Sequence, residues 1–118
     1  MKKVLQSLNK EFDECSEEGW DGYDALPITK EAYFEAMKLI KCLPITSFPM
    51  PEVAPEPNGE IGLEWFIGRR QVFNASVSGK NEIVYAGLFG VNKVHGTEYF
   101  GDSLPFAILE NLKRLYKD

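Results

Sequence analysis

The sequence is poor in the side chains that most often bind metal ions or act as nucleophiles. Its 118 residues contain one histidine, His95, and two cysteines, Cys15 and Cys42. A structural zinc site needs several cysteine or histidine ligands at short spacings, and a histidine-activated nucleophile needs a motif around it. Calcium loops and glycine-rich phosphate loops are missing too. We therefore expect no metal, no cofactor and no catalytic residue, and the balance favours a protein without enzymatic activity.

Long hydrophobic runs and an excess of basic residues are also missing. The apolar runs span a few residues, whereas a membrane-spanning helix needs about 20. Thirteen Lys and Arg stand against 18 Asp and Glu, and the net charge of −5 has the wrong sign for a nucleic-acid backbone. Two cysteines are too few for a secreted disulfide framework. We expect a cytoplasmic protein with no membrane and no direct nucleic-acid contact, in which Cys15 and Cys42 are buried free thiols; a disulfide or a reactive thiol is the alternative.

The apolar residues that are present predict one packed α+β domain over residues 1–118. They make up 44% of the chain, which is ample for a single core. Their three- and four-residue spacing predicts helices over about residues 2–18 and 30–43, the second capped by Thr29. The proline-rich segment 44–57 is then expected to be a stiff connector with at most a short edge strand over 52–54.

Beyond the connector, the spacing of apolar residues becomes that of strands. Alternation predicts strands over 61–67 and 72–77, and a further strand over 94–100. Residues 82–89 are apolar at odd and even positions alike, which is typical of a central strand. Asp102-Ser103 predicts the N-cap of a last helix. The predicted order is two helices, an antiparallel meander of four to five strands and one C-terminal helix, with the helices on one face of the sheet.

Negative charge is concentrated in one stretch near the N-terminus. Its members are Glu11, Asp13, Glu14, Glu17, Glu18, Asp21 and Asp24. Such a cluster is typical of a solvated helix face. An alternative is that it occupies a basic groove of a nucleic-acid-handling complex by imitating phosphate charge.

Surface recognition by aromatic and acidic side chains is the function that the residue pattern favours. Trp20 and Tyr23 share a tight turn with Asp21 and Asp24, and Phe66 lies beside Glu64 on the non-core face of its strand. Aromatic anchors of this kind are enriched at protein interfaces. We predict that these residues bind a partner: Trp20, Asp21, Tyr23, Asp24, Glu64 and Phe66. The alternative for Trp20 is inward packing against the end of the first helix.

Two segments of the chain carry a resemblance to a group of proteins. Residues 18–28 contain a Trp-Asp-Gly turn, and residues 55–65 contain a Gly-x-x-x-Leu-Glu-Trp strand. Over about residues 12–90 the chain resembles small uncharacterised bacterial proteins that are often carried on mobile elements and have no established activity. The resemblance implies a bacterial or phage origin and a role near phage defence, anti-defence or toxin-antitoxin systems.

Three hypotheses for function follow from the sequence. The leading one is a non-enzymatic module that binds another protein, acting as an accessory or inhibitor protein. The second is a small-ligand-binding protein or enzyme with a site near His95, Glu64 and Asp21, provided that folding gathers them near Trp20 and Tyr23. The third is a structural homodimer that pairs an exposed edge of the sheet.

Overall fold

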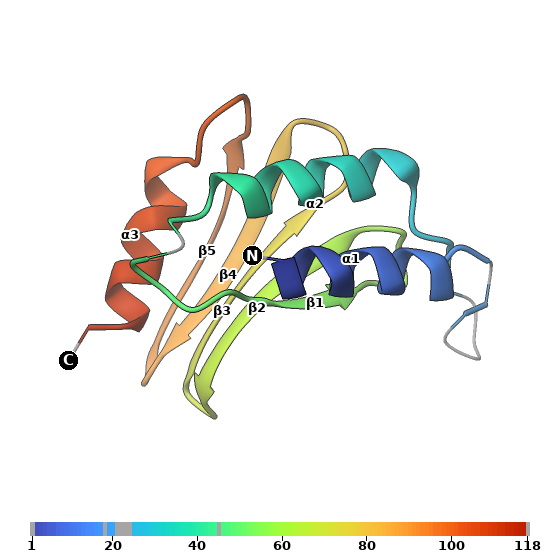
Figure 1. Ribbon diagram of the computed structural model, residues 1–118. Helices are drawn as coiled ribbons and strands as arrows, with labels where there is room; N and C mark the ends of the chain where they lie inside the picture. Colours follow the sequence, from blue (N-terminus) through green and yellow to red (C-terminus); the bar gives the residue numbers. More distant parts are fainter. Residues whose placement is uncertain (1, 18, 21–24, 45, 118) are drawn as a thin grey trace.

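The computed structural model describes residues 2–17, 19–20, 25–44 and 46–117 (Figure 1). Helices and strands follow one another in the predicted order, which confirms the α+β class. The elements are α1 (Lys2–Glu14), α2 (Lys30–Cys42), β1 (Glu52–Pro55), β2 (Ile61–Gly68), β3 (Gln71–Val77), β4 (Glu82–Phe89), β5 (Asn92–Tyr99) and α3 (Phe106–Leu115).

The five strands form one antiparallel sheet in the order β1-β2-β3-β4-β5, which is a simple meander. All three helices lie on the same side of this sheet (Figure 1). Successive side chains of a strand point to opposite faces, so only alternate residues of each strand meet the helices. The opposite face has no covering element within the described part of the chain.

The core lies between the helix layer and the covered face of the sheet. Odd-numbered residues of β2 and β3, such as Leu63, Trp65 and Phe73, are fully or almost fully buried there. The helices contribute residues at helical spacing, for example Leu39 of α2 and Leu112 of α3. The alternation in the sequence therefore correctly predicted which face of each of these two strands is buried.

A buried carboxylate joins α2 to the turn between β3 and β4. The side chain of Glu35 is 6% exposed, and its two oxygens accept hydrogen bonds from the backbone N–H groups of Gly79 and Asn81, each at 2.9 Å. Gly79 has a φ of +87°, and a Cβ there would lie 2.3 Å from the Cβ of Glu31. Only glycine combines this backbone conformation with so close an approach to the helix.

Two helix boundaries differ from the sequence-based expectation. Helix α1 ends at Glu14 rather than near residue 18, because the carbonyl of Cys15 accepts from the N–H of Ile28 at 2.9 Å and so leaves the helical pattern. Helix α3 begins at Phe106 and not after Asp102-Ser103. Its N-cap is Pro105, and a residue that precedes proline is disfavoured in helical conformation, which excludes Leu104. The cap of α2 by Thr29 is confirmed.

The Glu35 contact yields a stability prediction. We expect Glu35→Ala to lower the free energy of unfolding by about 2 to 4 kcal/mol, because it leaves two backbone donors without their charged acceptor. Glu31→Ala, one turn earlier on the exposed side of α2, is the matched control and should cost less than about 1 kcal/mol. Urea denaturation of both variants measures the difference, and equal losses would contradict the role assigned to Glu35.

Candidate functional site

The uncovered side of the sheet is a broad surface that no helix or strand of the described residues covers. It is formed by the even-numbered residues of β2, β3 and β4 and the odd-numbered residues of β5. We call this surface the open face. Its central members are Glu64, Phe66, Val72, Asn74, Val84, Ala86, Leu88, Lys93 and His95.

Strand register assembles the open face into rows of side chains. Glu64 pairs with Asn74, Asn74 with Ala86, and Ala86 with His95, which gives one row across four strands. The adjacent row runs from Phe66 through Val72 and Leu88 to Lys93. Residues that are up to 31 positions apart in the sequence thereby lie in one row on one surface.

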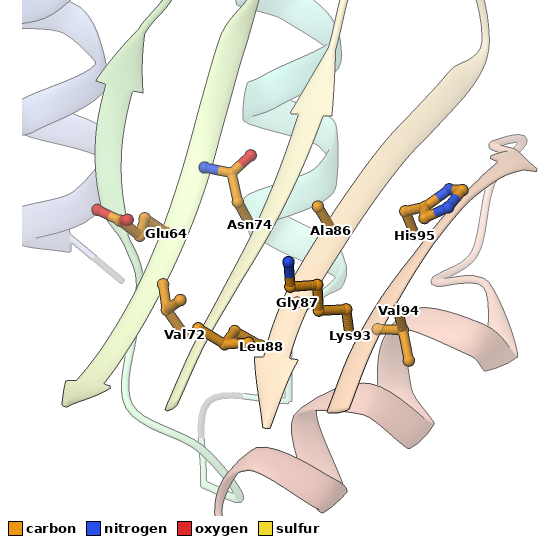
Figure 2. Close-up of a pocket in the computed structure, with 9 residues that line it drawn as sticks. All are labelled: Glu64, Val72, Asn74, Ala86, Gly87, Leu88, Lys93, Val94 and His95. Carbon is orange, nitrogen blue, oxygen red and sulfur yellow. The ribbon is translucent and has the colours of Figure 1, made fainter. Parts of the chain in front are cut away.

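A pocket of about 400 Å³ lies over these two rows. Val72, Ala86 and Leu88 supply its apolar floor, and Figure 2 shows their side chains between Glu64 on one flank and His95 on the other. The side chain of Lys93 extends inward over β4 in the same view. The pocket is therefore a shallow apolar groove with charged groups at its sides.

Beside the groove the carboxylates lie on β1 and β2 and the basic side chains on β5, whereas Glu82 at the far end of β4 is a further carboxylate of the open face next to β5. Glu52 pairs with Glu64 across β1 and β2, so both carboxylates lie on one flank. Lys93 and His95 lie on the opposite flank, on β5. Glu64 and His95 are three strand spacings apart, or about 14 Å between Cα atoms. At that distance the two side chains cannot pass a proton directly, so they do not form an acid–base pair.

Polar groups at one end of the open face satisfy each other. The hydroxyl of the buried Ser76 donates to the carboxylate of Glu56 at 2.6 Å and lies 3.0 Å from the side-chain oxygen of Asn74. A Cβ at Gly62 would lie 3.1 Å from both the Glu56 and the Asn74 side chains, so glycine leaves room for this cluster. We assign the cluster to holding β1, β2 and β3 in register.

Part of the apolar surface of the open face is exposed to solvent. Phe66 is 62% exposed and Val84 is 49% exposed, and Ala86 beside Val84 on the same strand is exposed as well. Strand β4 is central in the sense that it pairs on both sides, with β3 and β5. Its apolar even-numbered residues nevertheless face outward, so only one of its two apolar faces is covered.

The predicted partner-binding residues do not lie on one surface. Glu64 and Phe66 are on the open face, as their strand positions indicated. Trp20 is half-buried against the core on the helix side, and its indole N–H donates to the carbonyl of Leu26 at 2.7 Å. Asp21, Tyr23 and Asp24 lie outside the described residues. Thus Trp20 and Phe66 are on opposite sides of the sheet.

The acidic stretch is on the helix side as well. Asp13, Glu14 and Glu17 are exposed at or just beyond the end of α1, whereas Glu11 is half-buried. Glu18, Asp21 and Asp24 lie outside the described residues. The described residues of the acidic stretch and the open face therefore belong to two separate surfaces.

Both cysteines are free thiols in the structure, and Cys15 is buried as predicted, whereas Cys42 is only half-buried. Burial raises the pKa of Cys15 to about 11, and the nearby charges of Glu11 and Glu14 act in the same direction. The Sγ of Cys42 lies 3.8 Å from the carbonyl oxygen of Asp102. A thiol with a raised pKa is a poor nucleophile at neutral pH, so Cys15 is suited to core packing and not to chemistry.

No group of three or more His, Cys, Asp or Glu side chains that could hold a metal ion occurs in the described ranges. Among the helices of those same ranges, none is both long and apolar enough to cross a membrane. In comparisons with known proteins, no family model, no curated protein and no solved structure matches the chain. The function therefore has to be argued from the open face itself.

The raised pKa of Cys15 leads to a prediction about pH. The folded protein keeps the thiol protonated between pH 9 and about 11, whereas the unfolded chain loses that proton. Stability should therefore fall by roughly 2 to 3 kcal/mol as the pH rises through that window. Cys15→Ala should remove this part of the decline, and Cys42→Ser serves as the control. Urea denaturation from pH 8 to 11 measures the slopes, and an unchanged slope in Cys15→Ala would contradict the assignment.

The position of Trp20 leads to a prediction that separates packing from surface exposure. Trp20→Ala should lower the free energy of unfolding by about 2 kcal/mol, because it removes core contacts and the hydrogen bond to Leu26. Phe66→Ala should change it by no more than about 0.5 kcal/mol, since that ring is exposed. Thermal and urea unfolding of the two variants are the measurements. If Trp20→Ala left the free energy of unfolding unchanged, Trp20 would return to the candidate binding residues.

Proposed function

We propose that the protein is a non-enzymatic interaction module whose open face is covered by a protein partner in its working state. The observation that carries this proposal is the apolar surface of the open face, where Phe66 on β2 and Val84 and Ala86 on β4 are exposed and Val72 and Leu88 lie half-buried between them. Contiguous apolar surface rimmed by polar groups is typical of protein interaction sites. The sequence of β4, apolar at both odd and even positions, is likewise that of a strand covered on both faces.

The shape of the site supports a protein partner over a small substrate. The groove is shallow and extends over four strands, and its floor offers aliphatic side chains instead of convergent polar groups. Small-molecule sites usually enclose most of the ligand and place a few polar groups toward one point. Here Glu64 and His95 stand on opposite flanks. A partner surface that is apolar at its centre and carries complementary charges at its edges contacts the groove and both flanks at once.

The biological setting of this interaction is a second, coarser part of the proposal. It rests on the resemblance of about residues 12–90 to small bacterial proteins carried on mobile elements. We infer from it an accessory or inhibitor protein of phage defence, anti-defence or toxin-antitoxin systems. A binding role suits such proteins because inhibition of a larger complex needs a complementary surface and no chemistry of its own.

Site-specific photo-crosslinking in the source cells tests the proposed function. A photoreactive phenylalanine analogue replaces Phe66 on the open face or, as a matched control, Phe34 on α2, and the two native rings are 62% and 61% exposed. We expect a discrete crosslinked protein from position 66 and none from position 34. The added substitution Leu88→Asp should remove the product, because a charge on the groove floor opposes apolar contact.

The controls make the outcome decisive. Circular dichroism of the purified Leu88→Asp variant checks that it remains folded, so that a lost product reports on binding. Absence of any protein product at position 66, or an equal product at position 34, would overturn the assignment of the open face as the binding surface.

A further inference from the structure

We propose that the partner covering the open face is a second copy of this chain, packed sheet against sheet about a two-fold axis that runs parallel to the strands between β3 and β4. This inference rests on the proposed function and names its partner. Sheets that pack face to face keep their strand directions within about 30° of each other, and a two-fold axis along the strands produces such an aligned packing.

The dimensions of the open face suit an interface of this kind. The four strands that face one another about this axis, β2 to β5, lie about 4.8 Å apart and have seven or eight residues each, so they span about 19 Å by 26 Å. That area is about 500 Å² before the relief of the side chains is counted, and a standard stable interface buries about 800 Å² on each partner. The shared part of the open face is therefore the size of a small interface.

The separation of charge decides how the two copies are oriented. Carboxylates of Glu52 and Glu64 occupy the β1–β2 flank, and the cationic Lys93 with His95 occupies the β5 flank. A two-fold axis across the strands would place each flank against itself, acid on acid and base on base. An axis along the strands places the acidic flank of one copy against the β5 flank of the other, which is electrostatically favourable.

The strand register specifies which residues meet when the axis lies between β3 and β4. Strand β2 then faces β5 of the second copy, and β3 faces β4. In the shared rows, Glu64 lies opposite His95 and Phe66 opposite Lys93. Lys93 is one row from Glu64, within reach of its long side chain, and its ammonium group can also lie over the Phe66 ring. At the centre, Val72 and Leu88 pack against each other twice.

Two copies could also dimerise by pairing the free edges of their β5 strands, and this arrangement differs from face-to-face packing in which side chains it brings together. Strand β1 is protected as an edge, since it is four residues long, contains Pro55 and is covered by α1. Strand β5 has eight residues, and its outer edge pairs with no strand in the described part of the chain. Edge pairing would leave Glu64 and Lys93 of different copies far apart, whereas the face-to-face dimer brings them together.

Sedimentation equilibrium of charge-reversed variants is the experiment. We expect wild type to be a dimer at micromolar concentration. Glu64→Lys and Lys93→Glu should each raise the dimer dissociation constant at least about tenfold, because each places two like-charged pairs in the interface. An equimolar mixture of the two variants should dimerise again, since the heterodimer has two oppositely charged pairs, one native (Lys93 with Glu64) and one with its signs reversed. Glu17→Lys and Lys41→Glu, exposed on the helix side, make the same charge changes and should leave the dimer intact.

Three results would overturn the second copy as the partner. They are a wild-type monomer at every concentration, a dimer that neither reversal weakens, and single variants that the mixture fails to rescue. A wild-type monomer with a discrete crosslink from position 66 to a protein of another mass would leave the proposed function standing. A monomer with no crosslink would overturn both proposals.

Discussion

The hydrogen bonds from the β3–β4 turn to the carboxylate of Glu35 are the contact on which the arrangement of layers depends. They fix one end of the meander to the middle of α2, at a point where Gly79 allows backbone and helix to approach closely. A buried carboxylate is tolerated because two backbone donors satisfy it. Since α2 is held on that side, the apolar stripes of the helices all cover the same face of the sheet. The opposite face is left open as a consequence.

Most of the fold follows from the period of the apolar residues. The odd-numbered residues of β2 and β3 alternate mostly with polar or small ones, apart from Phe66 and Val72, and this pattern correctly predicted that Trp65 lies in the core. The helix ends were harder to predict because they depend on contacts with distant segments. Helix α1 ends where Cys15 bonds to Ile28, a contact that no local pattern indicates. The start of α3 could have been predicted from Pro105, whose effect on the preceding residue is local.

The open face could be predicted only in part, since it depends on the register of four strands. Glu64 and Phe66 were placed on the non-core face of their strand from alternation alone. Nothing local relates them to Lys93 or His95, which become neighbours only through three successive pairings. The signal that was available is the composition of β4. Its apolar residues at both odd and even positions were interpreted as a sign of a central strand, whereas they also mark a second face that requires a cover.

An uncovered apolar face has a physical cost that a fold can reduce in two ways, by placing polar residues on it or by binding another surface. In this sheet the first way is visible near Ser76, where a hydrogen-bonded cluster needs no partner. For the apolar groove around Leu88 we propose the second way, because it has no such cluster and the charges beside it, on β2 and β5, are of opposite sign. Charges of one sign that are gathered on one flank do not stabilise the isolated domain, because each charge repels its neighbours. They become favourable only when a surface with the opposite arrangement is placed against them, and a second copy of the same face, turned about the strand direction, has that arrangement.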